Sequence, residues 1–228
     1  MKVTAYGVHL ITALGAALGL WSVILTMDGF FQESVWVLAA AVFLDSIDGT
    51  LARYFDTKTH APEIDGALLD NIVDFLTWTI APLFWAYASM NLPLWIVMVC
   101  AVASALGFAN TEAKTSDYYF LGFPSYWNIV VFYLFLLQLP VYLSLAILLV
   151  FAVTTVAPVR FIYPNRTPDF RLLTMLLGII YSIQLLLLII LFDDSPAFLI
   201  YSSFIFPVYY FTMSFYLNIK QSETSPET

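Results

Sequence analysis

Long apolar segments separated by short polar ones run through the whole chain. A helix needs about 20 apolar residues to cross the hydrocarbon core of a bilayer, and the apolar segments here have lengths near that value. We predict spans at 8–27, 34–53, 67–90, 93–110, 124–139, 141–157, 172–192 and 196–216. The pattern therefore predicts an all-α, polytopic integral membrane protein, a helical bundle of about eight transmembrane helices in a single domain, 1–228.

Two parts of this pattern are less regular. The fifth and sixth segments are short and meet at Pro140, so the stretch 124–157 is either two full spans or a re-entrant pair. The chain ends in a polar stretch at about 219–228, which lacks the apolar residues needed to form a packed core. We expect it to be a tail without fixed structure.

Composition agrees with a membrane protein. Hydrophobic residues make up 61% of the chain and charged residues only 11%, whereas soluble domains carry roughly 25% charged residues. The net charge of −8 and the lack of a basic surface argue against a nucleic-acid partner. The single cysteine, Cys100, lies in an apolar segment and rules out a disulfide framework.

The distribution of charge predicts the orientation. With eight spans, every lysine and arginine falls on one side of the membrane: Lys2, Arg53, Lys58, Lys114, Arg160, Arg166, Arg171 and Lys220. The other side receives only acids: Asp28, Glu33, Asp193 and Asp194. Basic residues concentrate in cytoplasmic loops, so both termini are expected in the cytoplasm.

Four carboxylates interrupt the second and third apolar segments. Each charged side chain at mid-bilayer costs about 2.5 to 3.5 kcal/mol, so a neutralising partner is needed. Asp45 and Asp48 are three residues apart, and Asp70 and Asp74 are four apart, so each pair shares one helix face. Carboxylates converging from two helices form an all-oxygen site for a hard divalent cation such as Mg²⁺ or Mn²⁺. We predict that all four bind metal, in a pocket open to the cytoplasm.

The residues around these acids form a longer pattern. It reads Asp45-x2-Asp48-Gly49-x2-Ala52-Arg53, then twelve residues, then Gly66-x3-Asp70-x3-Asp74. The small residues leave helix surfaces bare, so that a nucleotide can approach the backbone, and an arginine can hold phosphate oxygens in a bidentate fork. The residues expected to contact a nucleotide diphosphate are Asp48, Gly49, Ala52, Arg53 and Gly66.

This pattern resembles the signature of the CDP-alcohol phosphotransferases, whose commoner form has eight residues between the arginine and the second glycine. The twelve-residue gap is similar to the phosphatidylcholine synthase branch of that family. Three other stretches are similar to the same branch: Val8-His9 with Thr12, LGFPSYWNIV at 121–130, and APVRF at 157–161.

The resemblance implies an activity. A phosphatidyl group would pass from CDP-diacylglycerol to choline with release of CMP, in a reaction dependent on Mn²⁺ or Mg²⁺. It also implies that Asp74, the last acid of the pattern, is the base that accepts the proton of the acceptor hydroxyl. A homodimer in the bacterial inner membrane, with the active site facing the cytoplasm, is expected on the same ground.

The acceptor site is harder to predict. A quaternary ammonium is held by aromatic faces and a nearby carboxylate, and candidates cluster just before the fifth span: Glu112, Asp117, Tyr118, Tyr119, Tyr126 and Trp127. Arg160 and Arg166 are candidates for the lipid phosphate. An interfacial aromatic belt and the excess of cytoplasmic bases account for the same residues, so both interpretations stand.

Three other functions fit part of the pattern. A related enzyme could use serine, inositol or glycerol phosphate as the acceptor. An intramembrane prenyltransferase also uses paired acids on a diphosphate, but Leu44 stands where such enzymes typically have asparagine, and Gly-x2-Ala-Arg follows. A cation-coupled transporter would show internal repeats and broken helices at the midplane, and we find no such repeat.

Overall fold

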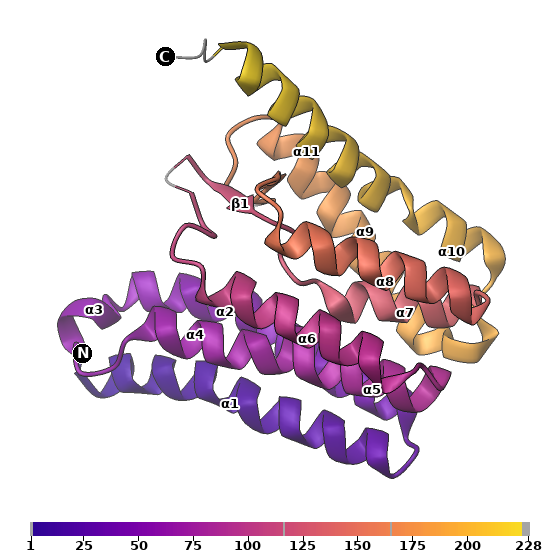
Figure 1. Ribbon diagram of the computed structural model, residues 1–228. Helices are drawn as coiled ribbons and strands as arrows, with labels where there is room; N and C mark the ends of the chain where they lie inside the picture. The colour runs from indigo at the N-terminus through magenta and orange to yellow at the C-terminus, as the bar shows by residue number, and fades with distance from the viewer. Residues whose placement is uncertain (1, 116, 165, 225–228) are drawn as a thin grey trace.

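The computed structural model describes residues 2–115, 117–164 and 166–224, and helices make up most of this part of the chain (Figure 1). The first half contains α1 (Lys2–Met27), α2 (Phe31–Tyr54), α3 (Thr57–His60), α4 (Gly66–Asp74), the π-helical segment η1 (Phe75–Ile80), α5 (Ala81–Met90) and α6 (Leu94–Ala109). The second half contains β1 (Tyr119–Leu121), α7 (Trp127–Leu137), α8 (Val141–Val156), β2 (Arg160–Ile162), α9 (Arg171–Leu191), the 3-10 segment η2 (Phe192–Asp194), α10 (Ala197–Ser203) and α11 (Ile205–Thr224).

The helices confirm an all-α integral membrane protein, but not the predicted number of spans. Five helical segments are long and apolar enough to cross a bilayer: Lys2–Met27, Phe31–Tyr54, Gly66–Met90, Arg171–Asp194 and Ala197–Ile219. The other predicted spans contain shorter helices, α6 and α8 with 16 residues each and α7 with 11. At 1.5 Å per residue α7 is about 16 Å long, well short of the roughly 30 Å of hydrocarbon.

Local backbone conformation explains why α7 is so short. Proline at 124 lacks a backbone donor, and Ser125 has a positive φ of 55°, so the chain before Trp127 is not helical. The helix stops at Gln138, which takes the left-handed conformation with φ 46° and ψ 44°, and Pro140 follows. The expected span 124–139 therefore loses residues at both ends.

The molecule has two halves (Figure 1). The helices α1 to α6 form one half, in which α1 packs along α2 and against α4 and α5, and α7 to α11 form the other. Contacts of α6 with α8 and of α5 with α7 join them. The start of α1, α3, β1 and the end of α11 lie at one end of the bundle (Figure 1), which we call the loop end.

The main core lies where the two halves meet. Its largest fully buried side chains include Trp85, Trp127, Ile96 and Leu148. Apolar side chains also cover the outside: on α9, those of Leu176, Ile179, Ile183 and Ile190 are exposed. Spacings of three, four and seven residues place them on one face, as expected for a helix that faces lipid.

A short two-stranded sheet at the loop end was not predicted. Strands β1 and β2 pair antiparallel, with Phe120 opposite Phe161. Phe161 and Tyr119 belong to a second apolar cluster that also contains Tyr210 and Leu217 of α11. Helix α11 continues to Thr224, into the segment expected to be a polar tail, and residues 225–228 of that tail lie outside the described residues.

Candidate active site

Three of the four predicted metal ligands converge between α2 and α4. Asp45 of α2 and Asp70 and Asp74 of α4 each offer a carboxylate oxygen, and these atoms lie within 4.8 Å of one another. Asp48 is only 5% exposed and lies outside this close group. It lines the same small cavity, whose walls are Thr12, Gly15, Ala41, Leu44, Asp45, Asp48, Asp70, Val73 and Asp74.

Glycines on α1 hold α4 close enough to form this cavity. A Cβ atom added at Gly15 would lie 2.5 Å from Cγ1 of Val73, and one added at Gly19 would lie 2.7 Å from Cγ of Leu76. Both distances are too short for any side chain, so the two helices pack backbone against side chain. The Gly15–Gly19 step is the small-xxx-small pattern that permits such packing in membranes.

The start of α4 is fixed by its own sequence. The Asp65 side chain accepts hydrogen bonds from the backbone N–H groups of Ala67 (3.0 Å) and Leu68 (3.1 Å), which satisfies two of the unpaired donors of the first turn. Gly66 follows, where an added Cβ would lie 3.0 Å from Cε1 of His9. His9 is 5% exposed, and its Nε2 atom has no hydrogen-bond partner.

The helix widens immediately after Asp74. In η1 the N–H of Ala81 bonds to the carbonyl of Leu76, five residues earlier. Pro82 comes next in the chain and cannot donate a backbone hydrogen bond. Single π-helical turns often mark functional sites, and this one separates Asp74 from the buried half of the same helix.

The three carboxylates suit a divalent cation. The carboxylate oxygens of Asp45, Asp70 and Asp74 lie within 4.8 Å of one another, and ionised carboxylates have only acceptors, so a cation between them would relieve their mutual repulsion. An all-oxygen set of acids is the donor chemistry of Mg²⁺ and Mn²⁺. The residues present therefore fit a hard divalent ion.

A lysine from a distant loop also reaches this group. Nζ of Lys114 lies 3.7 Å from Oδ2 of Asp70. The loop-end segment between α6 and β1 carries this lysine, which was predicted only as a marker of orientation. It is the only lysine or arginine between Lys58 and Arg160, and that isolation in the sequence is the one signal that could have found it.

The predicted nucleotide residues lie on the two helices that carry the acids. Gly49 and Ala52 are half-buried on α2, and Gly66 is half-buried at the start of α4. Arg53 is exposed, and its Nη2 atom donates to Oγ1 of Thr50 at 3.0 Å, one turn back on the same helix. Its guanidinium lies beside Gly49, another residue that is expected to contact the nucleotide.

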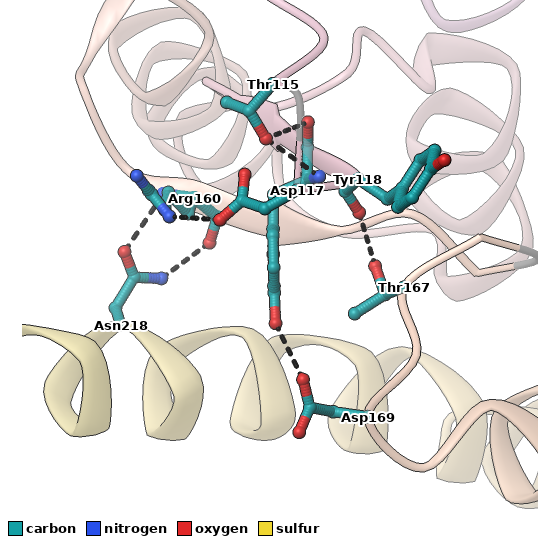
Figure 2. A network of polar contacts seen from close by, with 8 residues as sticks. Thr115, Asp117, Tyr118, Arg160, Thr167, Asp169 and Asn218 are labelled. Atoms are coloured by element: carbon teal, nitrogen blue, oxygen red, sulfur yellow. Dashed lines mark hydrogen bonds and ion pairs between the residues drawn. The ribbon is translucent and has the colours of Figure 1, made fainter.

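Three of the predicted choline residues, Asp117, Tyr118 and Tyr119, belong to a polar network at the β1–β2 sheet (Figure 2). Nη1 of Arg160 lies 2.8 Å from Oδ2 of Asp117, and the Tyr119 hydroxyl donates to Asp169 at 3.1 Å. A bond from Thr115 and the neighbouring Arg160 guanidinium hold the pKa of Asp117 below its usual range. Burial, together with the bond to Asp169, raises the pKa of Tyr119 to about 12.

The same network joins three parts of the chain. The Thr167 hydroxyl donates to the carbonyl of Tyr118 at 2.6 Å, so the predicted residue Tyr118 contributes its backbone. Asn218 of α11 accepts from the Arg160 N–H and donates to the Arg160 carbonyl (Figure 2). Arg166, predicted with Arg160 for lipid phosphate, stacks on Tyr163 with 5.3 Å to the ring centroid.

The remaining choline candidates, Trp127, Tyr126 and Glu112, lie in three different surroundings. Trp127 is fully buried, and its Nε1 donates to Oγ of Ser104 at 2.6 Å, inside the core. Tyr126 lies within electrostatic reach of Asp45 and Asp74 and packs on Trp78, with 5.3 Å between ring centroids. Glu112 is exposed and lines a separate loop-end cavity with Lys114 and Arg160.

Trp78 was missed in the sequence. It follows Asp74 by four residues, a spacing that puts both side chains on one face of a helix. Tyr126 is therefore the predicted aromatic residue that lies near the carboxylates, and Trp78 adds a second ring that the prediction did not include.

Comparison with known proteins identifies the family of the chain. Residues 8–192 match the family model described as CDP-alcohol phosphatidyltransferase. A phosphatidylcholine synthase of Legionella pneumophila is 34% identical over 93% of this chain and 88% of its own length. Another, of Pseudomonas aeruginosa, is 36% identical over 83% and 81%, and one of Borreliella burgdorferi is 35% identical over 78% of each chain. The chain belongs to the CDP-alcohol phosphatidyltransferase family.

Proposed function

We propose that the protein is a phosphatidylcholine synthase, which transfers the phosphatidyl group of CDP-diacylglycerol to choline and releases CMP. The observation that carries this proposal is the convergence of Asp45, Asp70 and Asp74 in a chain whose relatives are named phosphatidylcholine synthases over most of their length. The family match favours a nucleotide substrate over the prenyltransferase and transporter alternatives.

The chemistry follows from the site. The oxygen of choline attacks the phosphorus next to the lipid, the bond from that phosphorus to the CMP oxygen breaks, and CMP leaves. Asp74 accepts the proton of the choline hydroxyl as general base. Asp45, Asp48, Asp70 and Asp74 would hold Mn²⁺ or Mg²⁺, which neutralises the diphosphate and its leaving group. Positioning and charge neutralisation carry most of the catalysis in such transfers.

The nucleotide is held by the other residues of the pattern. Gly49, Ala52 and Gly66 leave room for the cytidine, because none of them carries more than a methyl group. Arg53 would turn from Thr50 to the phosphate oxygens, and Asp48 borders the same space. The acyl tails stay in the bilayer throughout.

For choline we favour the aromatic pair beside the acids. A quaternary ammonium binds over aromatic faces, and the rings of Tyr126 and Trp78 pack against each other near Asp45 and Asp74. Asp117 already pairs with Arg160, and Tyr119 with Asp169, so in this proposal they hold the β1–β2 sheet in place and do not bind choline. Arg160 and Arg166 remain the proposed contacts of the lipid phosphate.

The proposal includes an orientation and an assembly. The bases and the carboxylates group at the loop end, so this end faces the cytoplasm of a bacterial inner membrane under the positive-inside rule. The family resemblance supports a homodimer, and the molecular mass of the detergent-solubilised protein tests it.

The decisive experiment measures CMP release by the purified protein with CDP-diacylglycerol and Mn²⁺, with and without choline. We expect release that needs choline and stops on chelation. Release that ignores choline but responds to serine, inositol or glycerol phosphate would keep the family and replace the acceptor. No release with any alcohol would overturn the proposed activity.

A further inference from the structure

Lys114 stands at the junction of the metal-ligand group and an open cavity. The backbone around it is fixed: Lys114 pairs with Phe120 in an isolated β-bridge, and the N–H of Leu121 donates to the carbonyl of Ala113 at 2.9 Å. Its side chain is half exposed, with Nζ 3.7 Å from Oδ2 of Asp70. A rigid backbone thus presents a long, mobile side chain to the acids.

The ammonium of Lys114 faces three carboxylates, one in direct contact and two farther away. Asp70 is its direct partner, and Asp45 and Asp74 lie within electrostatic reach of it. Among the described residues, this ion pair is the one that joins the carboxylate group to a base. The ammonium therefore supplies part of the positive charge that buried acids need.

Open space lies on the other side of the same lysine. A cavity of about 390 Å³ is lined by Thr111, Glu112, Lys114, Thr115, Leu121 and Arg160. The hydroxyls and the two bases make this wall polar, and four rotatable bonds let the lysine head move between the wall and Asp70. The side chain has room to change partners without movement of the β1–β2 sheet.

We propose that Lys114 is a diphosphate-binding residue outside the sequence pattern, which pairs with Asp70 until a cation and the nucleotide arrive and then pairs with the phosphates. This inference rests on the proposed function. A cation bound by Asp70 repels the ammonium, and the diphosphate beside it offers a new anionic partner within the same reach. Lys114 thus competes with the cation when the nucleotide is absent and cooperates with it when the nucleotide is present.

Binding measurements on the detergent-purified full chain test this without relying on turnover. Mn²⁺ binding is measured by electron paramagnetic resonance without nucleotide, and CDP binding by calorimetry with saturating Mn²⁺. The variants are Lys114→Met, which removes the charge, and Lys114→Arg, which keeps it. Lys58→Met is the matched control, because Lys58 is an exposed lysine of α3 at the same end of the bundle.

The two affinities of Lys114→Met should move in opposite directions. Loss of a partly exposed ion pair should tighten Mn²⁺ binding about two- to fivefold. Loss of a charged phosphate contact should weaken CDP binding about tenfold or more. Lys114→Arg and Lys58→Met should both stay within about twofold of the parent chain.

Other outcomes overturn the inference. If the Mn²⁺ and CDP affinities of Lys114→Met both stay unchanged, the lysine has no role in binding either one. If both affinities weaken, the lysine supports only the structure of the site. If the parent chain and Lys114→Met bind CDP equally well in the presence of Mn²⁺, this inference is refuted and the proposed function is kept. A parent chain that binds neither Mn²⁺ nor CDP refutes both.

Discussion

Gly15 of α1 lies directly against Val73 of α4, with no room for a methyl group between them. Because Val73 precedes Asp74 in the chain, the distance between the two helices sets the position of the proposed base. Gly15→Ala should lower the free energy of unfolding by about 1–3 kcal/mol, the usual cost of overpacking, and should reduce CMP release.

A thermal melt and the release assay measure both effects. Gly7→Ala is the matched control, because a Cβ added at Gly7 meets nothing within 4 Å. The double variant Gly15→Ala/Val73→Ala should recover part of the loss, since the smaller side chain reopens the contact. Equal behaviour of the Gly7 and Gly15 variants would show that the contact does not constrain the site.

Asp74→Asn should remove the proposed general base while keeping the shape of the side chain. We expect the variant to fold with a similar melting temperature and to release CMP at least about 100-fold more slowly, the typical lower bound for general-base loss. Asp28→Asn, at an exposed acid in the turn between α1 and α2, should retain full activity. Normal turnover in Asp74→Asn would remove the base assignment.

Trp78→Leu should weaken choline binding more than it slows the chemical step. A cation–π contact contributes about 0.5–2 kcal/mol, so the KM for choline should rise roughly two- to thirtyfold at a nearly constant kcat. Trp95→Leu, at an exposed tryptophan of α6, is the matched control. A choline KM that stays constant in Trp78→Leu would place the ammonium elsewhere.

The Asp117–Arg160 ion pair should stabilise the protein only above acidic pH. The folded chain lowers the pKa of Asp117, so the stabilisation is present above the unfolded value of about 3.9 and disappears as the pH falls through the folded value. Asp117→Asn should therefore lower the melting temperature at pH 7, by an amount equivalent to about 0.2–1 kcal/mol for an exposed pair.

Melting curves of the parent chain and the variant at pH 7 and pH 3 measure this difference. At pH 3 the gap between them should shrink. Asp56→Asn is the control, because Asp56 has a positive φ of 44° that asparagine also tolerates. A gap of the same size at both pH values would mean that the charge of Asp117 contributes nothing.

The sequence predicted the features that depend on helical periodicity. The spacing of Asp70 and Asp74 places both acids on one face of α4, so this part of the grouping follows from a local rule. The cap that Asp65 forms at the start of that helix was found only in the structure. The class of fold follows from the long apolar segments. Each predicted span contains a helix, although only five of the helical segments reach spanning length.

The features that depend on contacts between distant segments were not predicted. The sheet of β1 and β2 requires residues 119–121 to meet 160–162, which neither segment encodes alone. Lys114 forms a bridge with Phe120 of this sheet and reaches Asp70 from there. Asp117 and Tyr119 looked available for a ligand in the sequence, yet their partners, Arg160 and Asp169, lie more than 40 positions away.

The π-helical turn at Phe75–Ile80 changes the direction in which side chains point on either side of it along the helical segment Gly66–Met90. In an uninterrupted α-helix each residue advances the direction of the side chains by about 100°, so the angle between Asp74 and Trp85 would be fixed by their separation in the sequence alone. The π turn, whose hydrogen bonds span five residues instead of four, adds a fixed offset to that angle. The same helix can therefore direct Asp74 towards the other carboxylates and Trp85 into the buried core.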